Sequence, residues 1–232
     1  MTSARGILLD IEGTTTPIAF VKDVLFPFAR RNAASFLAAH GQQPEVEGEL
    51  ALLAKERRRE RPDGTLPGES SDPLPYLFWL MDRDRKSTAL KALQGRIWRD
   101  GYESGTLVSE VYPDVVPALA RLRAAAIDVS IFSSGSVLAQ RLLFGHTNAG
   151  DLRPYLRAHF DTTTGGKKEA ASYERIASEL GFAPRQVLFV SDVAEELDAA
   201  EEAGMETALC VRSGTQEPTE SRHRVVRSLD EI

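Results

Sequence analysis

Short strand-like runs and amphipathic stretches alternate along the second half of the chain. The runs are mostly apolar without regular polar alternation, and they cover residues 127–132, 157–161, 186–190 and 206–211. Apolar side chains recur at helical spacing in residues 137–146, 167–181 and 194–204. Strands of this kind joined by helices are typical of a parallel sheet covered on both faces. With one more central strand at 7–10 and a last strand at 206–211, the pattern predicts an α/β fold with a doubly wound parallel sheet.

Residues 17–108 differ from the rest because their pattern is almost entirely helical. Apolar positions at helical spacing fill three stretches, residues 20–41, 44–61 and 74–102. The segment between the last two, residues 62–75, is rich in Pro, Gly and Ser and is predicted to be a loop. We therefore expect a helical cap at residues 20–105, inserted after the first strand of a catalytic core that comprises residues 1–19 and 106–232.

Composition narrows the choice of partners. The 232 residues carry a net charge of −6, so no basic field would attract nucleic acid. No apolar stretch approaches the about 20 residues needed to cross a bilayer, and no secretion signal is recognisable. The single cysteine, Cys210, lies in an apolar run and is expected in the core rather than as a nucleophile. We expect a cytoplasmic monomer that acts on a small molecule, with no nucleic-acid or membrane partner.

Acidic and hydroxyl side chains follow the predicted strands at the points where the strands end. These residues are Asp10, Glu12, Ser133, Ser134, Asp192 and Glu196. Because the carboxyl ends of parallel strands share one edge of the sheet, we expect them to lie together, joined by Lys167. Several carboxylates crowded together call for a cation, and Mg²⁺ prefers a few carboxylate oxygens together with water and substrate phosphate. The sequence therefore predicts a magnesium site at this edge.

The same residues suit the transfer of a phosphoryl group. A carboxylate such as Asp10 can attack phosphorus and form an aspartyl-phosphate. Glu12 could then protonate the leaving oxygen and activate the water that clears the intermediate. Lys167 would neutralise the phosphoryl oxygens, and the Ser133 hydroxyl would orient one of them. This pattern favours hydrolysis of a phosphomonoester.

Together these motifs resemble those of the haloacid dehalogenase (HAD)-like phosphatases. The matching positions are Asp10-x-Glu12-Gly13-Thr14, Ser133, Lys167 and Asp192-x3-Glu196. Glu12 is a departure, since these phosphatases usually carry Asp at the second acid. Longer stretches within residues 6–212 are similar to the acireductone synthase (enolase-phosphatase) family of methionine salvage: LLDIEGTTTPIAFVKDVLFP, DRKSTALKALQG, SSGSVLAQRLLFGH and FDTTTGGKKEAASY. The resemblance implies a HAD-like Rossmannoid core.

The resemblance also implies a reaction and roles for single residues. The family enolises 2,3-diketo-5-methylthiopentyl-1-phosphate and then removes its phosphate, which gives 1,2-dihydroxy-3-keto-5-methylthiopentene, with one Mg²⁺ per subunit. By analogy the metal ligands would be Asp10, Glu12 and Asp192. The substrate would bind at positions Ser133, Ser134 and Lys167. The catalytic residues would be Asp10, Glu12 and Lys167.

Some assignments stay open at this stage. Lys168 is adjacent to Lys167 and could take its place, and Glu195 competes with Glu196 as the partner of the lysine. Asp161 is expected to be structural, and no histidine has the spacing of a metal ligand. Lys91 and Arg96, in the helical insertion, are further candidates for substrate contact.

Alternative functions are consistent with parts of the pattern. A HAD-type phosphatase acting on another small phosphomonoester would use the same residues. A dehalogenase of the same fold would have no use for the acidic Asp192-x3-Glu196 pair. A binding module without catalysis would be expected to have lost the nucleophile, but Asp10 is present.

Overall fold

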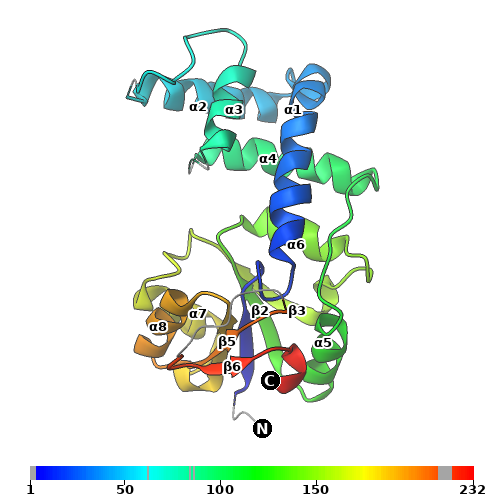
Figure 1. Ribbon diagram of the computed structural model, residues 1–232, viewed down its shortest axis with the longest axis vertical. Helices are drawn as coiled ribbons and strands as arrows, with labels where there is room; N and C mark the ends of the chain where they lie inside the picture. The colour runs from blue at the N-terminus through cyan, green and yellow to red at the C-terminus, as the bar shows by residue number, and fades with distance from the viewer. Residues whose placement is uncertain (1–3, 62, 84, 86, 214–220) are drawn as a thin grey trace. The chain divides into compact units, whose positions relative to one another are not determined.

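The computed structural model describes residues 4–213 and 221–232, apart from Pro62, Asp84 and Lys86. The chain forms two compact units (Figure 1). Unit 1 comprises Met1–Val21 and Val108–Ile232, and unit 2 comprises Lys22–Leu107. Each boundary differs by two residues from the one predicted for the core and the insertion. That unit 2 acts as a cap stays a prediction.

Unit 1 is built on a parallel six-stranded sheet with strand order β3-β2-β1-β4-β5-β6. The strands are β1 (Gly6–Leu9), β2 (Asp128–Phe132), β3 (Leu156–Phe160), β4 (Val187–Ser191), β5 (Glu206–Cys210) and β6 (Arg224–Val226). The helices of unit 1 are α5 (Val115–Ala124), α6 (Val137–Gly145), α7 (Ala170–Leu180) and α8 (Ala194–Glu202), with short 3₁₀ turns at Arg153–Tyr155, Pro184–Gln186 and Leu229–Glu231. The predicted doubly wound α/β fold is confirmed.

Helices cover both faces of the sheet, which explains why its central strands are apolar throughout (Figure 1). Ile7 and Leu9 of β1 pack in the core beneath α5 and α6. Leu8, which points to the opposite face, packs in the core beneath α7 and α8. β1 is therefore buried on both sides, and the residue that follows it is held by a rigid strand.

Unit 2 contains only helices among its described residues. They are α1 (Phe26–His40), α2 (Pro44–Arg59), α3 (Leu74–Asp82) and α4 (Thr88–Glu103), and a short π-helix at Phe20–Leu25 leads into α1. The indole N–H of Trp98 donates to the Leu25 carbonyl at 2.9 Å, and Arg96 pairs with Glu49 at 2.7 Å. Arg96 is thus engaged within unit 2. No helix in the described ranges is long and apolar enough to span a membrane.

One expectation about the elements was wrong. The strand at 206–211 is not the last, because β6 pairs with β5 beyond it. Only a short run around Val225 and Val226 forms this edge strand, between charged neighbours, so no apolar run marked it. The stretch with helical spacing at 74–102 contains two helices, α3 and α4. Ser87 caps the start of α4 by accepting the Leu90 N–H at 2.9 Å.

Candidate active site

Asp10 follows the central strand β1, and its side chain is buried. The N–H of Asp10 donates to the Val190 carbonyl of β4 at 3.0 Å, and the Thr15 hydroxyl donates to the Asp10 carbonyl at 3.2 Å. Strand and loop therefore both fix this backbone. The carboxylate is presented at the carboxyl edge of the sheet, between the ends of β2 and β4.

Lys167 forms the centre of a buried charged cluster. Its Nζ lies 2.7 Å from Asp10 Oδ1 and 2.5 Å from Glu196 Oε2. The Ser191 hydroxyl lies 3.1 Å from Glu196 Oε2 and 3.4 Å from Asp10 Oδ2. One lysine and one serine, from separate parts of the chain, thus connect the residue after β1 to the first turn of α8.

The sequence left open which of two neighbouring residues is functional in two places, Lys167 or Lys168 and Glu195 or Glu196. The structure distinguishes them by burial. Lys167 and Glu196 lie in the buried cluster. Lys168 and Glu195 are exposed, and their side chains are 4.0 Å apart. Tyr173 fixes the backbone on the buried side, because its hydroxyl donates to the Lys167 carbonyl at 2.5 Å. In each pair the buried residue belongs to the cluster: Lys167 contacts Asp10, and Glu196 contacts Lys167.

Asp192 follows β4 and packs against Gly13 of the loop after β1. Gly13 has a φ of +67°, in the left-handed region, and a Cβ built there would collide with the Asp192 carboxylate. Burial and the nearby Asp10 carboxylate raise the pKa of Asp192 to about 7. Burial also raises the pKa of Glu196 despite its lysine partner. The ionised carboxylates are therefore incompletely compensated.

The net charge of this cluster favours the binding of a cation. Three carboxylates, Asp10, Asp192 and Glu196, face the single ammonium group of Lys167. Burial opposes the charge on Lys167, but Asp10 and Glu196 outweigh it and hold the pKa of the lysine above its usual value. A donor set of carboxylate oxygens with a net negative charge fits a hard divalent cation.

Ser133 and Ser134 follow β2. Ser133 is buried, and its Oγ accepts the Gly135 N–H at 3.2 Å. Ser134 is exposed. Gln140 of α6 links this loop to the end of β3, because its side-chain amide donates to the carbonyls of Gly135 at 2.9 Å and Phe160 at 2.7 Å. The loop is thus a supported turn with its serines at the edge of the sheet.

Glu12 lies on the exposed side of the loop after β1. That loop turns tightly around the Ile11 carbonyl, which accepts the N–H groups of Thr14, Thr15 and Thr16 at 3.2, 2.9 and 2.9 Å. Asp10 is therefore buried and Glu12 exposed, two residues apart on one turn.

Residues that the sequence left aside have structural roles. Asp161 accepts the N–H groups of Val137 at 3.0 Å and Thr163 at 2.8 Å, so it supports the start of α6. Cys210 is buried in the core, and burial raises the pKa of its thiol to about 11. Sequence reasoning missed Ser191 and Tyr173 as supports of the cluster. Ser191 stands directly before Asp192 at the strand end, which was the one signal available.

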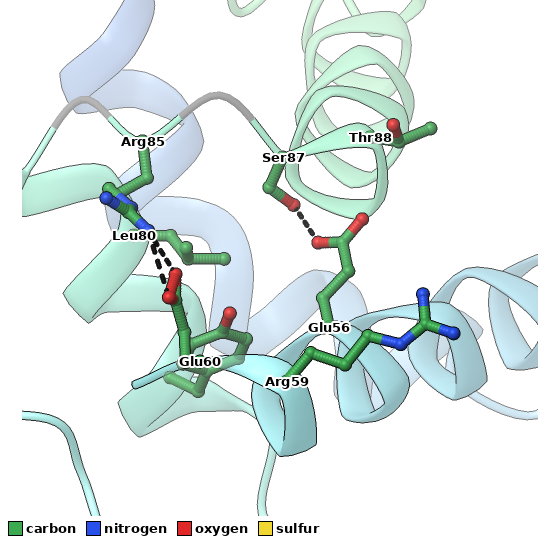
Figure 2. Close-up of a pocket in the computed structure, with 8 residues that line it drawn as sticks. Glu56, Arg59, Glu60, Leu80, Arg85, Ser87 and Thr88 are labelled. Atoms are coloured by element: carbon green, nitrogen blue, oxygen red, sulfur yellow. Dashed lines mark hydrogen bonds and ion pairs between the residues drawn. The ribbon is translucent and has the colours of Figure 1, made fainter. Parts of the chain in front are cut away.

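A separate pocket of about 610 Å³ lies within unit 2, and none of its lining residues was predicted to be functional. Figure 2 shows two of its contacts: the Ser87 hydroxyl donates to Glu56, and Arg85 pairs with Glu60. Glu56 thereby faces the first turn of α4, where a negative charge is stabilising. The charges in this pocket serve the packing of α2 against α4.

Comparison with known proteins agrees with the geometry. The haloacid dehalogenase-like hydrolase family matches residues 4–204. Enolase-phosphatase E1 of Synechococcus elongatus is 52% identical over 235 residues, which cover 99% of this chain and 98% of the relative. Enolase-phosphatase E1 of Sorangium cellulosum is 52% identical over 229 residues, which cover 99% and 97% of the two chains.

Solved structures give the same result for the fold. The crystal structure of the UTR4 protein from Saccharomyces cerevisiae is 33% identical, with a TM-score of 0.81 and coverage of 99% of this chain and 100% of that one. A dehalogenase structure at 22% identity, with a TM-score of 0.56 and coverage of 100% and 96%, shares the fold alone. Identity along nearly the whole chain shows that the protein belongs to the haloacid dehalogenase-like hydrolases and, among them, to the Enolase-phosphatase E1 family.

Proposed function

We propose that this protein is the enolase-phosphatase of methionine salvage. It would convert 2,3-diketo-5-methylthiopentyl-1-phosphate to 1,2-dihydroxy-3-keto-5-methylthiopentene and phosphate. The observation that carries the proposal is the buried contact of Asp10 with Lys167 at the end of the central strand, in a chain about half identical to enolase-phosphatases over its full length. A carboxylate held in this way is oriented for attack on phosphorus.

In this proposal Asp10 attacks the phosphorus, and the bond between phosphorus and the ester oxygen of the substrate breaks. Glu12 donates a proton to that leaving oxygen, then takes a proton from the water that hydrolyses the aspartyl-phosphate. Lys167 neutralises charge on the phosphoryl oxygens, and Glu196 keeps its ammonium in place. The hydroxyls of Ser133 and Ser134 bind the remaining oxygens.

Enolisation needs a base that removes a proton from the carbon bearing the phosphate. Glu12 is our candidate, because its side chain is one methylene longer than the aspartate usual at this position. It lies on the exposed side of the loop, on the same turn as Asp10. The base and the nucleophile would then act from one short segment.

Enzymes of this family are generally metal-dependent, and we propose Mg²⁺ as the metal. Asp10 and Asp192 would hold it, with Glu12 as the third ligand by family analogy, a role that would limit its action as a base. The ion would supply positive charge for the substrate phosphate. The uncompensated carboxylates described above fit this assignment. We further propose that the protein acts as a monomer in the cytoplasm, on a small-molecule phosphate.

The test follows enol absorbance and phosphate release together, on the diketone phosphate. The wild type with Mg²⁺ should form enol first and phosphate afterwards, and EDTA should stop phosphate release until Mg²⁺ is restored. Asp10→Asn should fold normally, by circular dichroism, and release no phosphate, because an amide cannot attack phosphorus. Phosphate release without enol would indicate a phosphatase for another small phosphomonoester. Substantial phosphate release by folded Asp10→Asn would exclude the covalent mechanism.

A further inference from the structure

Arg212 is a buried arginine just beyond β5, and its guanidinium reaches the loop after β1. Nε donates to the Thr14 carbonyl at 3.0 Å, and Nη2 donates to the same oxygen. Nη1 donates to Asp114 Oδ2 at 2.7 Å, and the guanidinium lies 4.3 Å from the centre of the Tyr112 ring. Arg212 is only 5% exposed. Burying a guanidinium is costly unless it is paired and hydrogen-bonded, and these partners offset that cost.

The segment held by Arg212 is the catalytic loop, residues 11–16, which carries Glu12. Within the loop, the Ile11 carbonyl accepts the N–H groups of Thr14, Thr15 and Thr16. The carbonyls of Thr14 and Thr15 instead accept hydrogen bonds from residues outside the loop. Arg212 takes the first of these, and the N–H of Tyr112 donates to the second at 3.0 Å. The loop is therefore hydrogen-bonded to two groups that come from different parts of unit 1.

Arg212 is itself held by a fixed partner. Asp114 Oδ2 also accepts the Leu229 N–H at 2.6 Å and the Ser228 hydroxyl at 3.1 Å. The carboxylate is thus anchored by three donors, and it lies immediately before α5. A continuous series of contacts runs from Leu229 through Asp114 and Arg212 to Thr14, and no member of it lies among the proposed metal ligands.

We propose that Arg212 is a positioning residue, which sets the reach of Glu12 by fixing the Thr14 carbonyl two residues away. The proposal rests on the acid–base role proposed for Glu12. A planar guanidinium can hold the carbonyl and Asp114 simultaneously, whereas a lysine ammonium has a single donor centre and cannot reproduce both contacts in the same geometry. Displacement of a catalytic group by about 1 Å can cost 10²-fold in rate.

The experiment compares phenyl phosphate with p-nitrophenyl phosphate, at saturating Mg²⁺, in Arg212→Lys and Arg212→Ala. Phenolate is the poorer leaving group and needs its oxygen protonated, whereas nitrophenolate leaves with little help. If Glu12 is displaced, the ratio of the two kcat/KM values, phenyl over nitrophenyl, should fall about tenfold in Arg212→Ala and less in Arg212→Lys. This ratio does not depend on the fraction of protein that is folded, so loss of stability alone would leave it unchanged.

Arg157→Ala is the matched control. Arg157 donates to the Leu180 carbonyl at 2.8 Å and pairs with Asp128 at the start of β2, so the variant removes a carbonyl and a carboxylate contact outside the series that leads to the catalytic loop. Its ratio should equal that of the wild type. An unchanged ratio in both Arg212 variants would overturn the proposal, as would an equal fall in Arg157→Ala.

Glu12→Gln separates this proposal from the proposed function. The variant should lower the same ratio, because an amide cannot protonate the leaving oxygen. If Glu12→Gln lowers the ratio and the Arg212 variants do not, the positioning role of Arg212 is excluded while the acid–base role stands. If Glu12→Gln leaves the ratio unchanged, the acid–base role fails and the positioning role with it.

Discussion

Lys167 Nζ lies within 2.7 Å of Asp10 Oδ1, although 157 residues separate the two in sequence. The contact joins the residue after β1 to the segment before α7. The ammonium is shared with Glu196, and both side chains of the Asp10–Lys167 pair are 7% exposed. The cluster is therefore a buried unit whose members can be tested one at a time.

Lys167→Gln should lower phosphate release by about 10²–10³-fold, because a fixed positive group beside the phosphoryl oxygens is lost. Lys168→Gln is the matched control, since Lys168 is exposed and lies 4.0 Å from Glu195. Its rate should stay within about twofold of the wild type. Steady-state phosphate release measures both. The opposite ranking would make Lys168 the functional lysine.

Glu196→Gln should reduce kcat by about 10–100-fold, the range seen when a group that orients an active-site residue is changed. Glutamine can still hydrogen-bond to Ser191 and Lys167, so the variant tests charge rather than packing. Glu195→Gln, the exposed neighbour, should be close to wild type. Equal activity of the two variants would show that Lys167 is oriented without the charge of Glu196.

Glu12→Asp should impair enolisation more than cleavage of a simple phosphate ester, because the shorter side chain no longer reaches the carbon-bound proton. The expected selective loss lies within about 10²–10⁴-fold, the usual contribution of general acid–base catalysis. Enol absorbance and phosphate release from the diketone phosphate, with p-nitrophenyl phosphate as the simple ester, provide the measurement. Equal losses in both steps would indicate a metal-ligand role and another residue as the base.

His159 should make stability depend on pH. Burial, together with the charge of Arg141, lowers the pKa of His159 to about 4. An unfolded histidine titrates near 6.5, so between about pH 6.5 and 4 the unfolded state binds more protons and the folded state is destabilised as the pH falls. The contribution is fully present above this window. In His159→Gln, the free energy of unfolding in urea should fall less between about pH 7 and 5 than in the wild type. Parallel losses in the two proteins would contradict this.

The fold was largely predictable because central parallel strands leave a plain signal. The runs around residues 7–10, 127–132 and 186–190 are apolar on both faces, and helices cover both sides. The edge strand β6 left no such signal, since Arg224 at its start is exposed and only Val226 is fully buried. Local pattern indicates burial, and an edge strand has little of it.

Part of the candidate site was predictable for a related reason. Asp10, Ser133 and Asp192 each follow a strand directly, so the topology alone brings them to one edge. Tyr173 and Arg212 could not be found in this way, because they act through the carbonyls of Lys167 and Thr14. Every residue type has a backbone carbonyl, so a contact to that group does not restrict the residue type at the accepting position. Such a contact therefore leaves no signal in the sequence. The burial of Lys167 rather than Lys168 likewise depends on the three-dimensional path of the loop before α7.

The close approach of Gly13 to Asp192 offers a way to move a carboxylate without altering its chemistry. A methyl group at position 13 would push against the Asp192 side chain and strain the left-handed turn, while every ionisable group in the cluster is retained. Gly13→Ala thus acts as a steric wedge of one carbon. The glycine and the aspartate thus depend on each other sterically, because the absence of a side chain at position 13 provides the space for the Asp192 carboxylate.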